Sequence, residues 1–212
     1  MDLAGLHHIT MITGDAPRNV AFSADLLGPR LVKKTVNFDA PEAYHLYFGD
    51  ERGSPGTIWT TFPYKGRGVR IGTKGAGQVT VTSFSVPGTA LGSWAARLTD
   101  RGARVIDGPS RFGEDAIVAV DPSGLAIELV GTTGDDRPGW TGGSIDADVA
   151  VRGLHSVTMT VRDAGATVSF MRDVLGFAPA NEMEGRTRMG VNGAVPGRVI
   201  DVVQAPDADA AV

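Results

Sequence analysis

Two adjacent histidines near the start of the chain, His7 and His8, have side chains that could hold a metal ion. The stretch around them returns 148 positions later, so one structural unit is used at least twice. The matching stretches are Gly5-Leu6-His7-His8-Ile9-Thr10-Met11 and Gly153-Leu154-His155-Ser156-Val157-Thr158-Met159. In the second copy His155 takes the place of His7, whereas Ser156 takes the place of His8. This difference favours a functional role for His8, because the second copy has a serine in its place.

Residues 5–13 are predicted to form a strand, in which successive side chains point to opposite faces. This places His8 and Thr10 on one face and His7 on the other. We expect His7 to pack against the following helix, with a smaller role in orienting His8. For His8 itself, a hydrogen-bonded core histidine is the alternative to a metal ligand.

The composition narrows the kind of site and of protein. The sequence has 212 residues, 42% of them hydrophobic, and lacks the apolar run of about 20 residues that a membrane span needs. A net charge of -4 with scattered basic residues disfavours nucleic acid or an anionic membrane as a partner. Without cysteine, a metal would need nitrogen or oxygen ligands. No secretory signal is recognised at residues 1–4, so a globular cytoplasmic protein is expected.

The order strand, helix and three strands recurs along the chain and predicts an α+β fold of repeated βαβββ modules. Asp15 is expected to cap the first helix and Gly28 to end it. The third unit shows only two strands after its helix, at 187–191 and 197–204, and is predicted to be incomplete. The predicted parts are a first unit at 4–72, a second at 77–131, a linker at 132–151 and a third unit at 152–212. Residues 4–131 are predicted to form the first domain.

Several motifs together resemble the vicinal oxygen chelate superfamily, which includes glyoxalase I, fosfomycin resistance proteins and extradiol ring-cleaving dioxygenases. The opening Leu6-His7-His8-Ile9-Thr10 and the later Asp121-Pro122-x-Gly124-x-x-Ile127-Glu128-Leu129 carry this resemblance. A closer resemblance, to hydroquinone-type ring-cleaving dioxygenases, covers nearly the whole chain. It rests on Tyr44-His45-Leu46-Tyr47-Phe48-Gly49-Asp50, Gly53-Ser54-Pro55-Gly56-Thr57, Thr60-Thr61-Phe62-Pro63 and Arg111-Phe112-Gly113.

The resemblance implies four modules in two pairs and a single Fe(II) or Mn(II) held by two histidines and a glutamate. Such a ligand set leaves coordination positions open for a chelating substrate and for O2. By position, His8 corresponds to the first metal ligand, and His7 and Thr10 to residues around the metal. The other two ligands belong to a fourth module, which this sequence is expected to lack.

Two further residues are candidates for the site. Glu128 lies on the last strand of the second unit, where the superfamily places its metal-binding glutamate. Its alternative is a half-buried carboxylate bonded to hydroxyls of neighbouring strands, in a vestigial copy of the metal site. Thr10 is expected to orient the substrate together with Tyr47 or, as an alternative, Tyr44, although packing of this aromatic strand explains the pattern equally well. On that strand, His45 is expected to face away from both Tyr44 and Tyr47.

The resemblance therefore implies a metal-dependent, extradiol-type ring-cleaving dioxygenase that acts on a small hydroquinone- or catechol-like aromatic and O2. Two alternatives stay open: an isomerase or thiol transferase of the glyoxalase kind, and a non-catalytic module that binds a small hydrophobic ligand. A homodimer is a further hypothesis, in which Glu128 of the partner subunit supplies a missing carboxylate.

Overall fold

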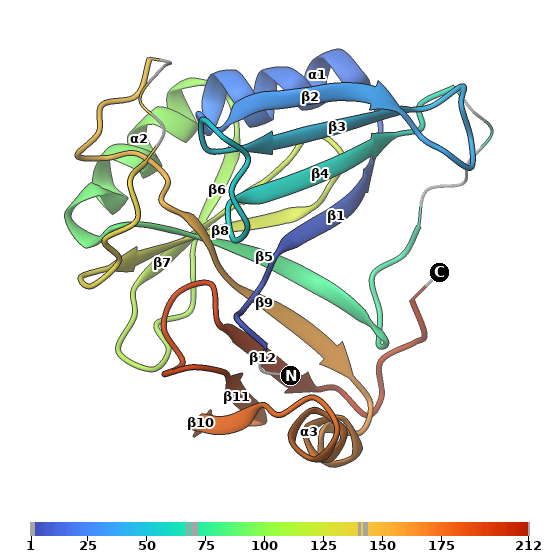
Figure 1. Ribbon diagram of the computed structural model, residues 1–212, viewed down its shortest axis with the longest axis vertical. Coiled ribbons are helices and arrows are strands. Elements are labelled where there is room, and N and C mark those ends of the chain that lie inside the picture. Colours follow the sequence, from blue (N-terminus) through green and yellow to red (C-terminus); the bar gives the residue numbers. More distant parts are fainter. Residues whose placement is uncertain (1–2, 67, 69–71, 140, 142–143, 212) are drawn as a thin grey trace.

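The computed structural model describes residues 3–66, 68, 72–139, 141 and 144–211 (Figure 1). Along these residues the order strand, helix and three strands occurs three times. The first unit contains β1 (His8–Thr13), α1 (Ala16–Val20) with the π-helical turn η1 (Ala21–Leu26), β2 (Arg30–Val36), β3 (Tyr44–Gly49) and β4 (Ile58–Pro63). The second contains β5 (Gln78–Pro87), the 3-10 turn η2 (Gly88–Ala90), α2 (Leu91–Asp100), β6 (Arg104–Asp107), β7 (Ala116–Val120) and β8 (Ala126–Thr132). The third contains β9 (Gly153–Val161), α3 (Ala164–Asp173), β10 (Ala178–Met183), β11 (Arg186–Gly190) and β12 (Val199–Gln204).

The strands form two sheets, and the predicted α+β fold is confirmed. The first unit makes a four-stranded sheet in the order β1-β4-β3-β2. The second and third units share an eight-stranded sheet in the order β10-β11-β12-β9-β5-β8-β7-β6, because β5 and β9 pair antiparallel. Hydrogen bonds thus join the second unit to the third, whereas the grouping of the first two units into one domain stays a prediction.

The first two units share the larger hydrophobic core. The first helix begins where expected, since the Asp15 carboxylate accepts a hydrogen bond from the Arg18 backbone N–H at 3.1 Å. It ends at Gly28, whose φ of 93° favours glycine. Between these points the helix buries three apolar residues against α2 and the segment predicted as a linker, which is packed rather than free. The helix contributes Phe22, Leu26 and Leu27, α2 contributes Trp94 and Leu98, and the segment contributes Ile145 and Ala150.

The helix of the third unit is covered much less. The repeat matches Phe170, Val174 and Leu175 to the three buried residues of the first helix. In α3 and directly after it, these residues are 55%, 65% and 41% exposed. Equivalent positions of the repeat therefore differ in burial, since α2 packs on the first helix and no described element packs on this side of α3. None of the described helices is long and apolar enough to cross a membrane.

The third unit has all three strands after its helix, one more than the sequence indicated. The additional strand is β10, which lies at the edge of the eight-stranded sheet (Figure 1). All six of its residues are exposed, so its sequence carries no alternation of apolar and polar types. Pairing with β11, rather than burial, makes it a strand.

Candidate functional site

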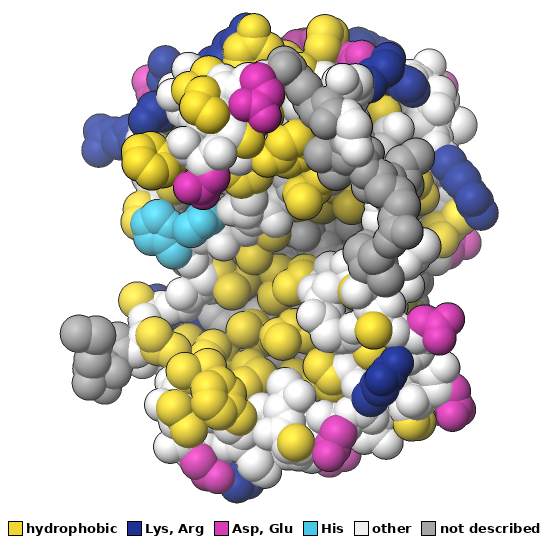
Figure 2. All heavy atoms as spheres, turned by 90° about the vertical axis from the view of Figure 1, so that its right-hand side faces the viewer, with side chains coloured by type: hydrophobic (Ala, Val, Ile, Leu, Met, Phe, Trp, Pro, Cys, Tyr) yellow, Lys and Arg dark blue, Asp and Glu magenta, His cyan; other side chains and the backbone are white. Residues whose placement is uncertain are grey.

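The first sheet carries His8, Thr10 and Tyr47 on one side, called here the open face. The strand register places Thr10, Thr60 and Tyr47 in one row across β1, β4 and β3. Because side chains alternate along a strand, His8 lies on the same side as Thr10, and Ile9 points to the hydrophobic core. Figure 2 shows histidine side chains at the edge of the upper part of the molecule, beside a hollow with largely hydrophobic walls.

His8 and His7 contact each other at the start of β1. Both are exposed, and their Nδ1 atoms lie 3.0 Å apart. The expectation that His7 packs against the helix is wrong. The strand begins only at His8, so the alternation does not extend to His7. A hydrogen bond between two Nδ1 atoms requires a hydrogen on one of them. If His8 is the donor, its Nε2 is left free to bind a metal or a substrate.

Thr10 presents a hydroxyl that a buried neighbour holds in place. Thr60 is 1% exposed, and its hydroxyl donates to the Thr10 hydroxyl oxygen at 3.0 Å. Thr10 is exposed on β1, and its own O–H is therefore available to an acceptor outside the sheet. A hydroxyl held in this way can orient an oxygen-containing ligand.

Tyr47 and His45 lie on the same side of β3, which corrects the expectation that they face apart. Residues two positions apart on a strand share a face. The Tyr47 hydroxyl lies 3.0 Å from His45 Nδ1, and the imidazole stacks on Phe62 with a centroid distance of 4.0 Å. Burial is the main cause that lowers the pKa of His45 below its ordinary value, and the positive charge of nearby Lys33 adds to it. His45 is therefore a neutral imidazole at physiological pH.

The open face offers too few ligands for a complete metal centre. Within the part of the chain that the structure describes, no group of three or more histidine, aspartate or glutamate side chains could hold a metal ion. His8 supplies one imidazole, whereas tight binding needs several ligands held in position. The described residues alone therefore do not fit the Fe(II) or Mn(II) site that the resemblance implies.

Glu128 lies in the other sheet, on β8, and its side chain is 3% exposed. Arg111 donates to both carboxylate oxygens, with Nη1 2.7 Å from Oε1, and the Ser83 hydroxyl donates to Oε2. The carboxylate is thus fully buried rather than half-buried, and its main partner is an arginine. Its metal-binding role stays a prediction that finds no support here, because both oxygens are engaged and His8 belongs to a different sheet.

A larger buried ion network surrounds this pair: Arg111, Glu114, Glu128, Arg188 and Asp201. Arg111 Nε donates to Asp201 at 3.1 Å, and Arg188 donates to both Asp201 at 2.8 Å and Glu114 at 2.8 Å. Burial alone would raise the pKa of Asp201, but hydrogen bonds and charge from Arg188, with the charges of Arg111 and Arg186, lower it. The network therefore holds the Asp201 carboxylate ionised.

The loop between β6 and β7 brings Arg111 into the network. The backbones of Arg111 and Glu114 bond to each other across a tight turn, in which Phe112 has a φ of 53° and Gly113 of 77°. The Arg188 guanidinium carbon lies 4.5 Å from the Phe112 ring centroid. The role of Arg111 in this network was not predicted from the sequence. Its only signal was the Arg111-Phe112-Gly113 motif, which does not reveal what the arginine contacts.

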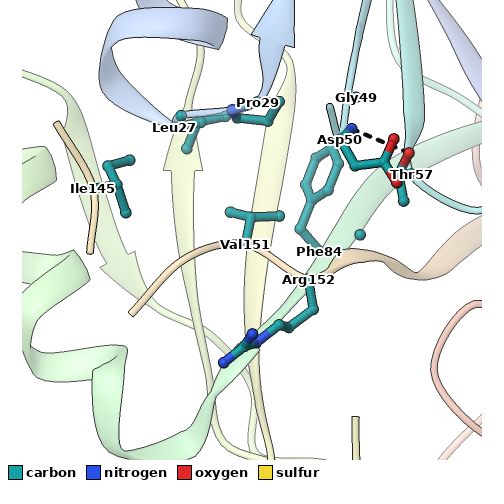
Figure 3. A pocket seen from close by; sticks show the side chains of 11 residues that line it. Leu27, Pro29, Gly49, Asp50, Thr57, Phe84, Ile145, Val151 and Arg152 are labelled. Atoms are coloured by element: carbon teal, nitrogen blue, oxygen red, sulfur yellow. Dashed lines mark hydrogen bonds between the residues drawn. The ribbon is translucent and has the colours of Figure 1, made fainter. Parts of the chain in front are cut away.

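A small pocket at the junction of the units contains none of the predicted site residues. Figure 3 shows that Leu27, Pro29, Phe84, Ile145 and Val151 line it. Its walls are mainly apolar, and it adds nothing to the chemistry of the open face. The candidate site is therefore the open face itself.

Comparison with a family model identifies the superfamily of the chain. The family model described as the Glyoxalase/Bleomycin resistance protein/Dioxygenase superfamily matches residues 5–129. The chain belongs to this superfamily. The matched residues span both the first unit with its open face and Glu128, so the family resemblance stated from the motifs is confirmed.

Relatives of this chain in the superfamily carry the names of ring-cleaving dioxygenases. It is 40% identical over 202 residues to the "Putative ring-cleaving dioxygenase MhqO" of Bacillus subtilis, covering 95% of this chain and 64% of the relative. It is 37% identical to the chlorohydroquinone/hydroquinone 1,2-dioxygenase of Sphingobium indicum, covering 93% of this chain and 62% of that enzyme. The chain thus spans less than two thirds of the length of these two relatives.

Solved structures give the same fold. A Bacillus subtilis crystal structure titled "putative dioxygenase" matches all of this chain and 67% of its own, with a TM-score of 0.91 and 38% identity. Glyoxalase I from Zea mays matches 98% of this chain and 70% of its own, with a TM-score of 0.73 and 16% identity. The second likeness shows only that the superfamily fold is shared.

Proposed function

We propose that this chain supplies one wall of the active site of a ring-cleaving dioxygenase that acts on small hydroquinone- or catechol-like aromatics and O2. The observation that carries the proposal is the row of hydroxyls on the open face, Thr10, Thr60 and Tyr47, beside the exposed imidazole of His8. The names of the relatives support the reaction class and the aromatic substrate.

The residues of the open face have distinct roles in this proposal. Thr10 and Tyr47 orient the substrate through hydrogen bonds to its oxygens. Ile12 and Phe62 lie in the next row, and contact with their side chains keeps water from the ring. His7 holds His8 through the contact between their Nδ1 atoms. The proposed cofactor is Fe(II) or Mn(II), for which His8 is one ligand. A cytoplasmic location and a homodimer stay predictions.

The test is oxygen uptake by this chain with hydroquinone in an excess of Fe(II) or Mn(II), because the described residues of the open face supply too few ligands to bind the metal tightly. We expect uptake that His8→Ala abolishes and that Tyr44→Phe leaves unchanged, because Tyr44 lies on the opposite side of β3 from Tyr47. Metal titration by calorimetry should show a site that His8→Ala loses. Uptake that is equal in wild type and His8→Ala would overturn the proposed role of this face.

One observation favours a second function, the non-catalytic binding of a small aromatic ligand. The open face has hydrogen-bond donors and apolar side chains, but its described residues include no group of three side chains that could hold a metal ion. Binding of a phenol without oxygen uptake would support this function. Turnover of a methylglyoxal–thiol adduct would instead support chemistry of the glyoxalase kind.

A further inference from the structure

We propose that His45 is a positioning residue that makes the Tyr47 hydroxyl a hydrogen-bond donor to an oxygen of the aromatic ligand. The inference rests on the proposed function, which places that ligand on the open face. It needs no metal, because it concerns only side chains of the first sheet and one oxygen of the ligand.

The contact between His45 and Tyr47 allows two arrangements of hydrogen. His45 Nδ1 and the Tyr47 hydroxyl oxygen lie 3.0 Å apart. Either the tyrosine donates to a bare Nδ1, or a protonated Nδ1 donates to the tyrosine oxygen. In the first arrangement the Tyr47 hydrogen is used within the protein. In the second it remains free to point elsewhere.

The surroundings of the other ring nitrogen select the second arrangement. His45 Nε2 is buried and has no hydrogen-bond partner among the described residues. If Tyr47 donated to Nδ1, the neutral ring would carry its hydrogen on Nε2, leaving a buried N–H without an acceptor. Buried N–H groups without partners are rare and costly. A hydrogen on Nδ1 leaves only a lone pair unpaired at Nε2.

Packing holds the imidazole in this orientation. The ring lies between Tyr47 and Phe62, with centroid distances of 4.1 Å and 4.0 Å and similar tilts of 34° and 33°. Burial and the positive charge of Lys33 also disfavour the doubly protonated imidazolium. His45 therefore remains a neutral donor to Tyr47, and the tyrosine O–H is directed to an acceptor outside the protein.

The surroundings of Tyr47 favour a negatively charged oxygen as that acceptor. The Lys33 ammonium lies 5.7 Å from the Tyr47 ring centroid, and Lys33 occupies the same row as Tyr47 and Thr60. A phenolate oxygen would accept from Tyr47 and be stabilised by this charge. Thr10, at the other end of the row, has a free O–H as well. Two donors in one row fit a ring with oxygens at two positions.

Nitrogen NMR of the histidine side chains tests the tautomer directly. In the ligand-free chain we expect His45 to show a protonated Nδ1 and a bare Nε2, and Tyr47→Phe to remove that preference. A protonated Nε2 in the wild type would overturn the inference. The measurement does not depend on any ligand or activity.

Binding of 4-nitrophenolate, followed by its absorbance, tests the consequence for a ligand. Losing one hydrogen bond should weaken binding about three- to tenfold in Tyr47→Phe and to a similar extent in His45→Leu. His45→Asn should recover part of the loss, because its side-chain amide places a donor close to the position of Nδ1. Tyr44→Phe is the matched control and should bind as wild type. Unfolding midpoints of all variants should confirm that they fold.

The outcomes separate this inference from the proposed function. Equal affinity in wild type, His45→Leu and Tyr47→Phe would overturn the inference while a phenol site remains. A loss in His45→Leu that His45→Asn fails to recover would show a packing role and also overturn it. Absence of binding to the wild type would overturn both the inference and the proposed phenol site.

Discussion

The open face of the first sheet and the face of the eight-stranded sheet that carries the buried ion network occupy equivalent places in the repeat. In the first unit one row reads Thr10, Thr60 and Tyr47 across β1, β4 and β3. In the third unit the equivalent row reads Thr158, Asp201 and Arg188 across β9, β12 and β11. Two of the three positions thus carry hydroxyls in the first unit and charges in the third, whereas Thr158 keeps the hydroxyl of Thr10.

This difference decides which face can receive a ligand. Charged groups taken out of water need partners, and the second and third units supply them from their own arginines. Asp201 is fully buried, and the side chains of Arg111 and Glu128 are each 3% exposed. On the open face, Thr10 and Tyr47 each keep a hydroxyl that needs no internal charge partner. The protein's own side chains therefore fill the face that carries the buried ion network, whereas the open face of the first sheet can receive a ligand.

The largest effect on stability is expected from removing Arg111, the arginine that bonds to both Glu128 and Asp201 in the buried ion network. Arg111→Ala leaves Glu128 buried without its cation and takes one of the arginines from Asp201. Removing one partner of a buried ion pair costs about 3–5 kcal/mol of unfolding free energy. Urea unfolding should show this loss, whereas Arg172→Ala, which breaks an exposed pair with Asp173, should change the unfolding free energy far less because water screens that pair. Equal losses would contradict the closed network.

Acid should weaken the same network without mutation. Hydrogen bonds and charges of their partners hold the pKa values of Asp201 and Glu114 below the ordinary range, despite their burial. Their stabilisation is complete above the pKa of unfolded carboxyls, about 4, and is lost as pH falls through the lower folded values. Thermal unfolding from pH 7 to pH 3 should show a falling midpoint below about pH 5, with a shallower slope in Asp201→Asn. A constant midpoint would contradict this account.

His155 and His7 occupy matching positions of the repeat, so their substitutions compare the same side chain in a buried and in an exposed place. His155 is 1% exposed and contacts Glu114 and Ser156, whereas His7 is exposed. His155→Ala should cost about 1–3 kcal/mol of unfolding free energy, because it leaves buried polar partners unpaired. His7→Ala should stay within about 0.5 kcal/mol. Chemical denaturation of both variants measures the difference, and equal values would remove the distinction between the faces.

The smallest effect on stability is expected at His8. Its exposed ring contributes little to packing, so His8→Ala should change the unfolding free energy by less than about 0.5 kcal/mol. Ser156, the matching residue, is fully buried, and Ser156→Ala should cost about 1 kcal/mol through its lost hydrogen bond to His155. The same denaturation series measures both. A large loss in His8→Ala would mean that His8 is structural.

Local rules allowed much of the first unit to be predicted. Asp15 and Gly28 mark the helix ends, and alternation along β1 places His8 with Thr10 because a strand repeats every two residues. The same rule fails for His7, which precedes the strand. The two-residue period also requires that His45 and Tyr47 share a face, and the expectation that they face apart did not apply it. β10 carried no pattern at all, because an edge strand with both faces exposed has no apolar side.

By itself, the sequence determined the repeated unit, most of its strands and the superfamily, since these depend on local periodicity and on motifs of fixed spacing. Only the tertiary structure decided that Arg111 reaches Glu128 and Asp201, which lie 17 and 90 residues further along the chain. A buried carboxylate needs a cation, but its position in the sequence does not say which one the fold delivers. That pairing closes one copy of the repeated face and leaves the other open to a ligand.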